Sequence, residues 1–358
     1  MVSKDRIFGS KGETDKSVNF IHPDKSEYMR RIFLISMLVG VVWVAAGQSQ
    51  AKVGLIAFYN LENLFDTIDT PGVLDEEFTP EGPNKWTGSR YLEKLDNMAM
   101  AISRIGEDDG WSGGPAILGV SEIENRSVLE DLAAHPLLKA SNYQVVHFDS
   151  PDRRGVDVGL LYRPRFFRVT SADSYELVLQ NERGERIYTR DQLLVSGVFD
   201  GEPMHFIVGH WPSRSGGEAT TKPRRNAAAA LSRHITDSLL TADPAAKIFI
   251  MGDLNDDPSD ESLRKYLRAA PKAHKLKEGE LFNAMYPLYK KGIGSLNYRD
   301  GLNLFDQIIL SPALTGKDYS SWKFLKARVF NSAFLMQKDG QYKGYPLRSF
   351  AGTVWQGG

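Results

Sequence analysis

Polar side chains with catalytic potential follow an apolar stretch in "KIFIMGDLNDDP", residues 247–258. Asp253 and Asn255 come directly after the apolar run. A carboxylate at such a position can activate water or bind a cation, and an amide can hold a polar substrate atom. The alternative is an Asx turn that caps the next helix. That alternative fits Asp256, Asp257 and Asp260 better than Asp253, because an acid next to a buried strand is costly without a partner.

A calcium loop is a second interpretation of the same segment. Asp253, Asn255 and Asp257 match the first half of an EF-hand loop. However, Pro258 stands where that loop needs Gly, and Arg264 where it needs a bidentate Glu. A predicted strand also precedes the segment where a helix is required, so we reject this interpretation.

Other apolar stretches also end or begin with polar residues that could take part in catalysis. Asn60 ends the first stretch, Glu122 the second and His210 a later one, and Asp306 begins the last. Catalytic groups of α/β proteins often lie at such strand ends, where the sheet holds them rigidly. Any one of them alone is more often a cap or turn residue.

The elements that must position these residues alternate between strands and helices. Apolar runs predict strands, and an apolar face with helical spacing predicts a helix over 89–105. A long Ala-rich helix is expected from about Glu218 to Leu240, and a hairpin over 186–213 should turn at Asp200 and Gly201. The other predicted strands are 52–60, 115–125, 142–150, 156–164, 247–255 and 304–312. This alternation, without a repeat or a linker, favours one α/β domain.

The stretches "LIAFYNLENLF", "ILGVSEIEN", "FIVGHWPSR", "IFIMGDLNDDP" and "LFDQIILS" occur in this order and together resemble the endonuclease/exonuclease/phosphatase superfamily. The resemblance runs from about Val53 to Ser311. It implies a four-layer α/β/β/α sandwich with two mixed sheets and the hydrolysis of phosphate esters with Mg²⁺ or Mn²⁺.

The resemblance also assigns roles. Glu122 matches the family's metal-binding Glu and Asn60 the Asn beside it, so we expect the Glu122 carboxylate and the Asn60 amide oxygen to bind the metal. Asp253 matches the carboxylate that activates water, and Asn255 the amide that holds a phosphate oxygen. His210 matches a donor to the phosphate, and Asp306 an acid that supports an active-site His.

The sequence departs from the family pattern at its end. The family's last strand carries a Ser-Asp-His segment, and no Asp in this sequence is followed by His. We therefore expect a chain whose last core strand is missing and whose activity is impaired. A catalytically inactive binding or scaffold protein that keeps the fold is the alternative function.

Arginines after His210 suggest phosphate contacts: Arg214, Arg224 and Arg225. A solvated helix start is the other interpretation. The substrate class stays open between nucleic acid, a phospholipid headgroup and a small phosphoester. With 44 Lys and Arg against 45 Asp and Glu, no global positive field favours a long polyanion.

Composition and the N-terminal region bound the remaining questions. The 358 residues include no Cys, which excludes disulfides and cysteine nucleophiles. Residues 29–50 have two Arg, a short apolar run and small polar residues, as in a signal peptide. We expect residues 1–28 to be a non-native extension and 51–358 the catalytic domain of an exported monomer. A short tail before a membrane anchor is the alternative, but no stable membrane insertion is expected once the signal is cleaved.

Overall fold

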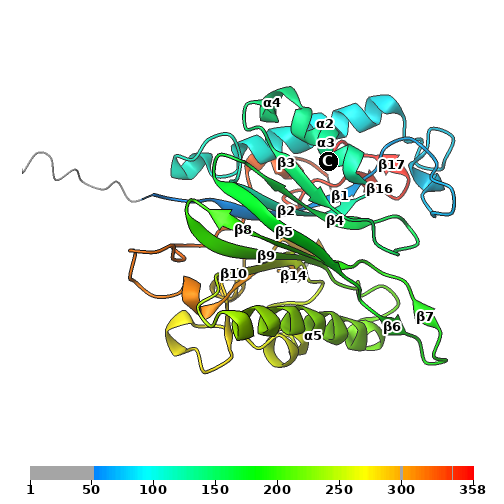
Figure 1. Cartoon of the computed structure of the whole chain (residues 1–358). Helices are drawn as coiled ribbons and strands as arrows, with labels where there is room; N and C mark the ends of the chain where they lie inside the picture. The colour runs from blue at the N-terminus through cyan, green and yellow to red at the C-terminus, as the bar shows by residue number, and fades with distance from the viewer. Residues whose placement is uncertain (1–51, 299–300, 341) are drawn as a thin grey trace, which may run out of the picture. The chain divides into compact units, whose positions relative to one another are not determined.

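The computed structural model describes residues 52–298, 301–340 and 342–358. The predicted segments 1–28 and 29–50 lie outside this range. Two large mixed sheets face each other (Figure 1). Within the described residues, no helix is long and apolar enough to cross a membrane.

The first sheet has four strands in the order β1-β2-β4-β3. Strands β1 and β2 are parallel, and the other two pairs are antiparallel. Its members are β1 (Ile56–Leu64), β2 (Ile117–Ile123), β4 (Asp157–Tyr162) and β3 (Gln144–His147). Strand β1 is at one edge of this sheet, and the expected loss of a last core strand stays a prediction.

The second sheet has seven strands in the order β11-β12-β15-β10-β9-β8-β5. Strands β9 and β10 are parallel, whereas β10 and β15 are antiparallel. Its members are β11 (Ala269–Ala270), β12 (Leu281–Asn283), β15 (Asp306–Leu310), β10 (Ile248–Asp253), β9 (Glu202–His210), β8 (Gln192–Phe199) and β5 (Phe167–Tyr175). The predicted hairpin is confirmed, because Asp200 and Gly201 join β8 to β9 with positive φ angles of 44° and 93°.

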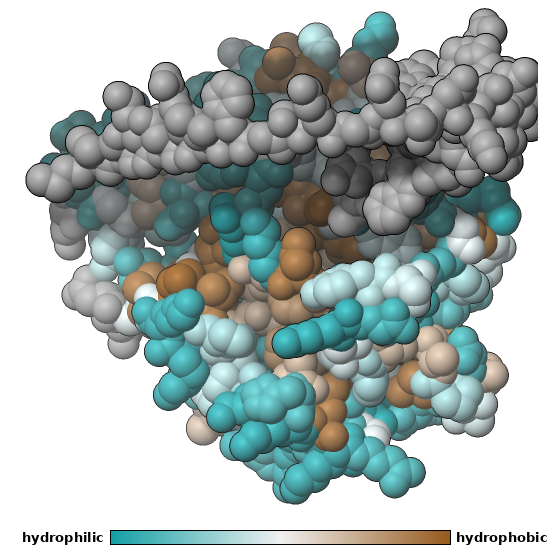
Figure 2. Space-filling view, turned by 90° about the vertical axis from the view of Figure 1, so that its left-hand side faces the viewer, coloured by the Kyte–Doolittle hydropathy of each residue, from teal (hydrophilic) through white to brown (hydrophobic). Residues whose placement is uncertain are grey.

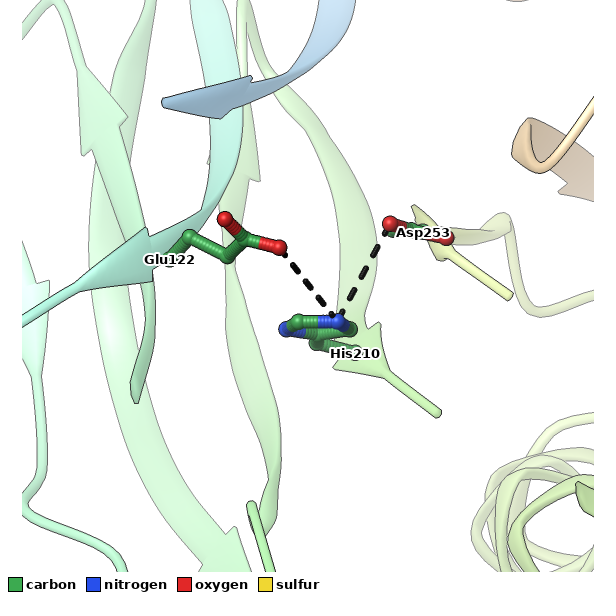
Figure 3. Close-up of side chains that lie close together, drawn as sticks. All are labelled: Glu122, His210 and Asp253. Carbon is green, nitrogen blue, oxygen red and sulfur yellow. Dashed lines mark ion pairs between the residues drawn. The ribbon is translucent and has the colours of Figure 1, made fainter. Parts of the chain in front are cut away.

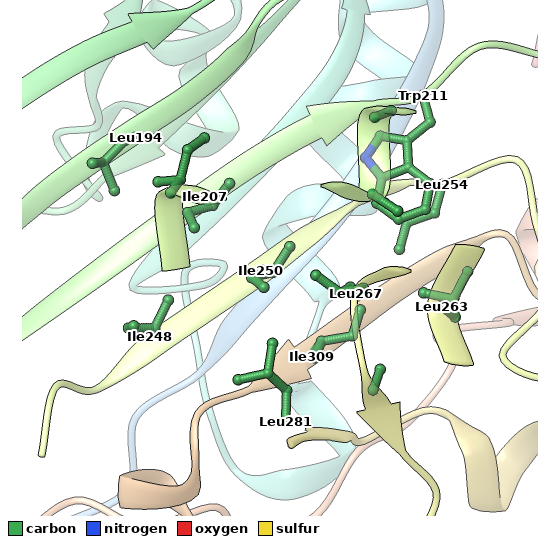
Figure 4. Close-up of a cluster of buried hydrophobic side chains, with 14 of the residues drawn as sticks. Leu194, Ile207, Trp211, Ile248, Ile250, Leu254, Leu263, Leu267, Leu281 and Ile309 are labelled. Carbon is green, nitrogen blue, oxygen red and sulfur yellow. The ribbon is translucent and has the colours of Figure 1, made fainter. Parts of the chain in front are cut away.

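Alternating side chains of the second sheet build two layers of core. On β10, Ile248 and Ile250 belong to the cluster that also contains Ile235 of helix α5 (Glu218–Ala242). Figure 4 shows these two β10 side chains beside Ile309 of β15 and Ile207 of β9. The intervening Phe249 and Met251 pack in the cluster that also contains Leu160 of the first sheet. Because successive strand residues point to opposite faces, one strand serves both layers.

Helices cover the outer face of the first sheet in the same way. Helix α2 (Gly88–Arg104) buries Leu95, Met98 and Ile102 against Leu118 and Val120 of β2. Helix α3 (Arg126–Ala134) adds to the same cluster, and α4 (Pro136–Lys139) follows it. Helices therefore lie outside two packed sheets, which confirms the expected sandwich.

Shorter elements fill the connections. They include the hairpins β6 (Leu179–Gln180) with β7 (Arg186–Ile187), β13 (Leu296–Tyr298) with β14 (Gly301–Asn303), and β16 (Phe350–Ala351) with β17 (Val354–Trp355), and the short helix α6 (Tyr286–Tyr289). Figure 2 shows the end of the domain where β1 begins, with hydrophobic residues between hydrophilic ones. The strand ends predicted to carry the site lie away from that face, because β1, β9 and β10 run from it toward their carboxyl ends.

Candidate active site

The strand ends of both sheets bring five predicted residues together. Within the large sheet, Asp253 pairs with His210 on one side and with Asp306 on the other. From the four-stranded sheet, Asn60 donates through Nδ2 to Glu122 Oε1 at 3.0 Å and to Asp253 Oδ2 at 3.1 Å. One amide therefore connects carboxylates that belong to different sheets.

His210 lies between the same two carboxylates. Its Nε2 is 3.8 Å from Glu122 Oε1 and 3.9 Å from Asp253 Oδ2 (Figure 3). Burial, together with the positive charges of Arg190 and Arg154, holds the pKa of His210 well below its usual range. The ring is therefore neutral at pH 7, and a neutral imidazole can donate one hydrogen bond to a substrate oxygen.

The acids repel one another. Burial and the charges of Asp306 and Glu122 raise the pKa of Asp253. Burial also raises the pKa of Asp306, and the charge of Glu122 adds to this effect. Without a cation, these carboxyl groups bind protons more readily than an exposed acid would.

This set of donors suits a hard divalent cation. The metal-ligand atoms that Glu122, His210 and Asp253 offer all lie within 4.8 Å of one another. Asp306 Oδ1 is buried and has no hydrogen-bond partner among the described residues. Buried, mutually repelling oxygens next to an unpartnered one are what Mg²⁺ or Mn²⁺ would stabilise.

Local backbone strain accompanies the site. Glu62, Asn63, Glu122 and Asn255 have φ angles of 48°, 61°, 57° and 50°. Such values are uncommon for residues other than Gly, and they concentrate at functional sites because the surroundings must hold them in place. Glu122 lies where the pairing of β2 with β4 shifts register, so a bulge sets the direction of its side chain.

Asn255 is close to the site but has another partner. Its backbone N–H donates to Asp253 Oδ1 at 3.0 Å, and its side-chain Nδ2 donates to the main-chain oxygen of Trp211 at 3.0 Å. Of the remaining acids, Asp260 accepts from the N–H of Asp257, as in a turn. Asp256 accepts from Arg225, and Asp257 from the N–H of Leu304, so these two bind other segments of the chain. Phosphate binding by Asn255 stays a prediction.

The three predicted phosphate-binding arginines do not join the cluster of acids. Arg225 is fully buried and donates to Asp256 Oδ1 at 2.6 Å. Arg214 contacts Asp260 at 2.7 Å and stacks on Phe305. Arg224 is half-buried on α5. These geometries give Arg214 and Arg225 structural roles, and phosphate contact stays a prediction for all three.

Arg190 is a site residue that the sequence interpretation missed. It is buried and donates to Asp152 Oδ2 at 3.1 Å and to the main-chain oxygen of Trp211 at 2.9 Å. Arg154 lies beside Asp152 and is half exposed. The predicted hairpin could have revealed Arg190. This residue lies just before β8, and β8 begins beside the end of its antiparallel partner β9, where His210 lies.

A second group of possible ligands lies at His147, Asp149 and Asp157. His147 Nε2 is 3.0 Å from Asp157 Oδ2, and Asp157 Oδ1 also accepts from the backbone N–H and hydroxyl of Ser150. Asp157 is thus already satisfied by the chain itself.

Comparison with solved structures gives the following likenesses. Truncated TDP2 from Caenorhabditis elegans is 17% identical, with 63% of this chain and 79% of that chain covered and a TM-score of 0.44. A mannosyl-6-phosphatase from Bacteroides thetaiotaomicron is 16% identical, with 73% and 86% covered and a TM-score of 0.45. An endonuclease/exonuclease/phosphatase from Bacteroides vulgatus is 14% identical, with 73% and 88% covered and a TM-score of 0.45.

No curated protein matches the sequence significantly. The model of the Endonuclease/Exonuclease/phosphatase family matches residues 55–358, which is most of the chain. Members of this superfamily are generally metal-dependent phosphoesterases. The chain belongs to the Endonuclease/Exonuclease/phosphatase family.

Proposed function

We propose that the chain is a hydrolase of phosphoric esters, of the phosphodiesterase or endonuclease type, that uses Mg²⁺ or Mn²⁺. The observation that carries this proposal is the joining of Glu122 and Asp253 by one amide of Asn60, with His210 between them. A scaffold protein has no need for acids such as Asp253, whose pKa is raised by burial and by neighbouring acids, and replacing them by apolar residues would stabilise it.

The cation would be held by Glu122, with oxygens of Asp253 or Asp306 nearby. When bound, it would neutralise charge on the phosphate and keep the carboxylates ionised. We infer that Asp253 accepts a proton from the attacking water.

The neutral ring of His210 donates its Nε2–H to a phosphoryl oxygen as negative charge develops. Arg190 and Arg154 add positive potential beside His210, in a site partly closed to water. The chain's own residues thus supply a base, a donor and a favourable field.

We also propose that the protein is exported and acts as a monomer. The export proposal rests on the signal-like residues 29–50. N-terminal sequencing of the mature protein tests it: a mature chain that begins near Ala51 supports cleavage, whereas retention of residue 29 contradicts it.

The central test compares wild type with Asp253→Asn on three substrates: bis-p-nitrophenyl phosphate, plasmid DNA and sphingomyelin. Each assay is run with Mn²⁺, with Mg²⁺ and with EDTA. We expect EDTA to abolish turnover and Asp253→Asn to lower kcat by about 10² to 10⁴-fold. The substrate that is turned over fastest identifies the ester class.

The matched control is Asp173→Asn, which neutralises an exposed acid of the same sheet, on β5. It should keep wild-type turnover. Hydrolysis that survives both EDTA and Asp253→Asn would contradict the proposed mechanism. The absence of wild-type turnover on all three substrates would contradict the proposed activity.

A further inference from the structure

Lys94 is a fully buried lysine on the inner face of α2. Its Nζ donates to the main-chain oxygen of Glu62 at 2.7 Å and to the hydroxyl of Ser349. A buried ammonium is costly unless its hydrogen bonds are satisfied. A chain that keeps this lysine in its core therefore has a use for the groups that the lysine holds.

The first of these groups is a strained bulge within β1, just after the active-site residue Asn60. Glu62 and the next residue, Asn63, both have positive φ angles. The side chain of Glu62 accepts from the backbone N–H of Ser349 at 2.8 Å and from its hydroxyl at 3.1 Å. Lys94 and Ser349 thus hold both the backbone and the side chain of Glu62, which opposes relaxation of the strained conformation.

The bulge also fixes an amide in the candidate active site. The backbone N–H of Glu62 donates to Asn60 Oδ1 at 2.8 Å. Since this bond occupies the amide oxygen of Asn60, its Nδ2 must face Glu122 and Asp253, as the distances above show. The assignment of amide oxygen and nitrogen thus follows from the hydrogen-bond network.

We propose that Lys94 is a positioning residue for the reaction: through Glu62 it orients the amide of Asn60, which in turn holds the carboxylates of Glu122 and Asp253. The kinetic test of this inference rests on the proposed phosphoesterase function, whereas the Mn²⁺ titration does not require turnover. Lys94 touches neither carboxylate in the described contacts, so its effect on them is indirect. Residues one shell removed from a metal site commonly change affinity or activity by about 10 to 100-fold when replaced.

The test uses Lys94→Met and measures two quantities. Calorimetric titration with Mn²⁺ should show affinity reduced by about 10-fold or more, independently of any substrate. Steady-state kinetics on the best phosphodiester should show kcat reduced by about 10 to 100-fold with KM within about twofold, because the substrate contacts are unchanged.

Ser349→Ala provides a second variant, because Lys94→Met can fail to fold. It removes the hydroxyl that joins Lys94 to the Glu62 carboxylate and leaves the bond from Lys94 to the Glu62 main chain. We expect a smaller loss in the same direction, about threefold to 10-fold in Mn²⁺ affinity and in kcat.

Asn97→Ala is the matched control on the same helix. Asn97 Nδ2 donates to the main-chain oxygen of Gly357, so it contacts the same C-terminal segment without touching Glu62. This variant should keep wild-type Mn²⁺ affinity and kcat. Equal losses in Asn97→Ala and Lys94→Met would show general loosening of the segment and would overturn the positioning role.

The chain has no Cys, so the Lys94→Cys variant carries a single thiol that can be modified to restore an ammonium group at this position. Alkylation of the unfolded variant with 2-bromoethylamine restores an ammonium group, and wild type is taken through the same refolding cycle. Recovery of Mn²⁺ affinity and kcat supports the proposal, whereas unchanged values with and without the ammonium refute it. If wild type turns over no substrate, the proposed function fails, and the Mn²⁺ titration still decides the role of Lys94.

Discussion

At the scale of single residues, the site depends on the side-chain amide of Asn60, whose oxygen and nitrogen each have defined hydrogen-bond partners. Asn60 accepts from the N–H of Glu62 and donates to Glu122 and Asp253. The sequence interpretation made Asn60 a metal ligand, and that role stays a prediction. The geometry adds a different role, since an amide donor between two acids reduces their repulsion.

Asn60→Asp tests this role, because the change keeps the side chain's shape and replaces the donor by an acceptor. A carboxylate facing two others should lower the free energy of unfolding by about 2 kcal/mol or more in EDTA. Added Mn²⁺ should stabilise this variant more than wild type, because the cation neutralises the extra charge. Thermal unfolding with EDTA and with Mn²⁺ measures both effects.

The control is Asn142→Asp, which changes an exposed residue that also has positive φ, 52°. It should unfold like wild type under both conditions. An Asn60→Asp variant as stable in EDTA as wild type would show that the amide donor contributes nothing to the metal-free site.

At the scale of elements, the strands that the apolar runs predicted are present, and their polar ends meet. The parallel register of β9 and β10 and the antiparallel register of β15 place His210, Asp253 and Asp306 side by side. Strand-end reasoning could find these residues because it depends only on period and order. Such reasoning cannot identify contacts that residues from other parts of the fold make with the site.

Three kinds of site feature escaped the sequence interpretation. In the sequence, Lys94 cannot be told apart from the other polar residues of its helix, and only the fold shows that it contacts Glu62. Positive φ at Glu122 arises from a bulge, which leaves no residue signal because the residue is not Gly. Arg225 reads as a solvated or phosphate-binding cation, yet its partner Asp256 is 31 residues away.

Gly252 shows how closely the elements must approach beside the site. A Cβ at this position would lie 2.0 Å from the main-chain oxygen of Gly209 on the neighbouring strand. Gly252→Ala must therefore push β9 and β10 apart next to Asp253 and His210. We expect a loss of about 3 kcal/mol or more in the free energy of unfolding, together with weaker Mn²⁺ binding.

Urea denaturation measures the change in stability. Gly88→Ala is the control, because its Cβ would meet nothing within 4 Å and its φ is not positive. That substitution lies at the start of α2 and should be neutral or stabilising. Similar destabilisation by both substitutions would mean that the close approach of β9 and β10 is not the reason that Gly252 is required.

At the scale of the whole domain, the C-terminal segment binds elements that are distant in sequence. Phe350 and Trp355 pack against the aromatic cluster of Phe65, Phe78 and Trp86. Trp355 also donates to Glu93 of α2 at 2.9 Å. The segment thus joins α2 to the end of β1, and Lys94 lies at that junction.

The buried ammonium should make the stability of the domain depend on pH. Burial lowers the pKa of Lys94 to about 8, although the charges of Glu62 and Glu122 oppose this shift. In the unfolded chain its pKa is near the ordinary value of about 10.4. Between these values the unfolded chain binds the proton more tightly, so the free energy of unfolding rises as pH rises.

The measurement compares wild type with Lys94→Met by urea denaturation from about pH 7 to about pH 9.5. Over this range the free energy of unfolding of wild type should rise by about 2 kcal/mol relative to the variant. The range stops below pH 10 because burial raises the pKa values of Tyr59 and Tyr143, which lowers stability at higher pH. A difference between the two proteins that stays constant with pH would mean that the folded chain keeps Lys94 charged throughout, held by the main-chain oxygen of Glu62 and the hydroxyl of Ser349.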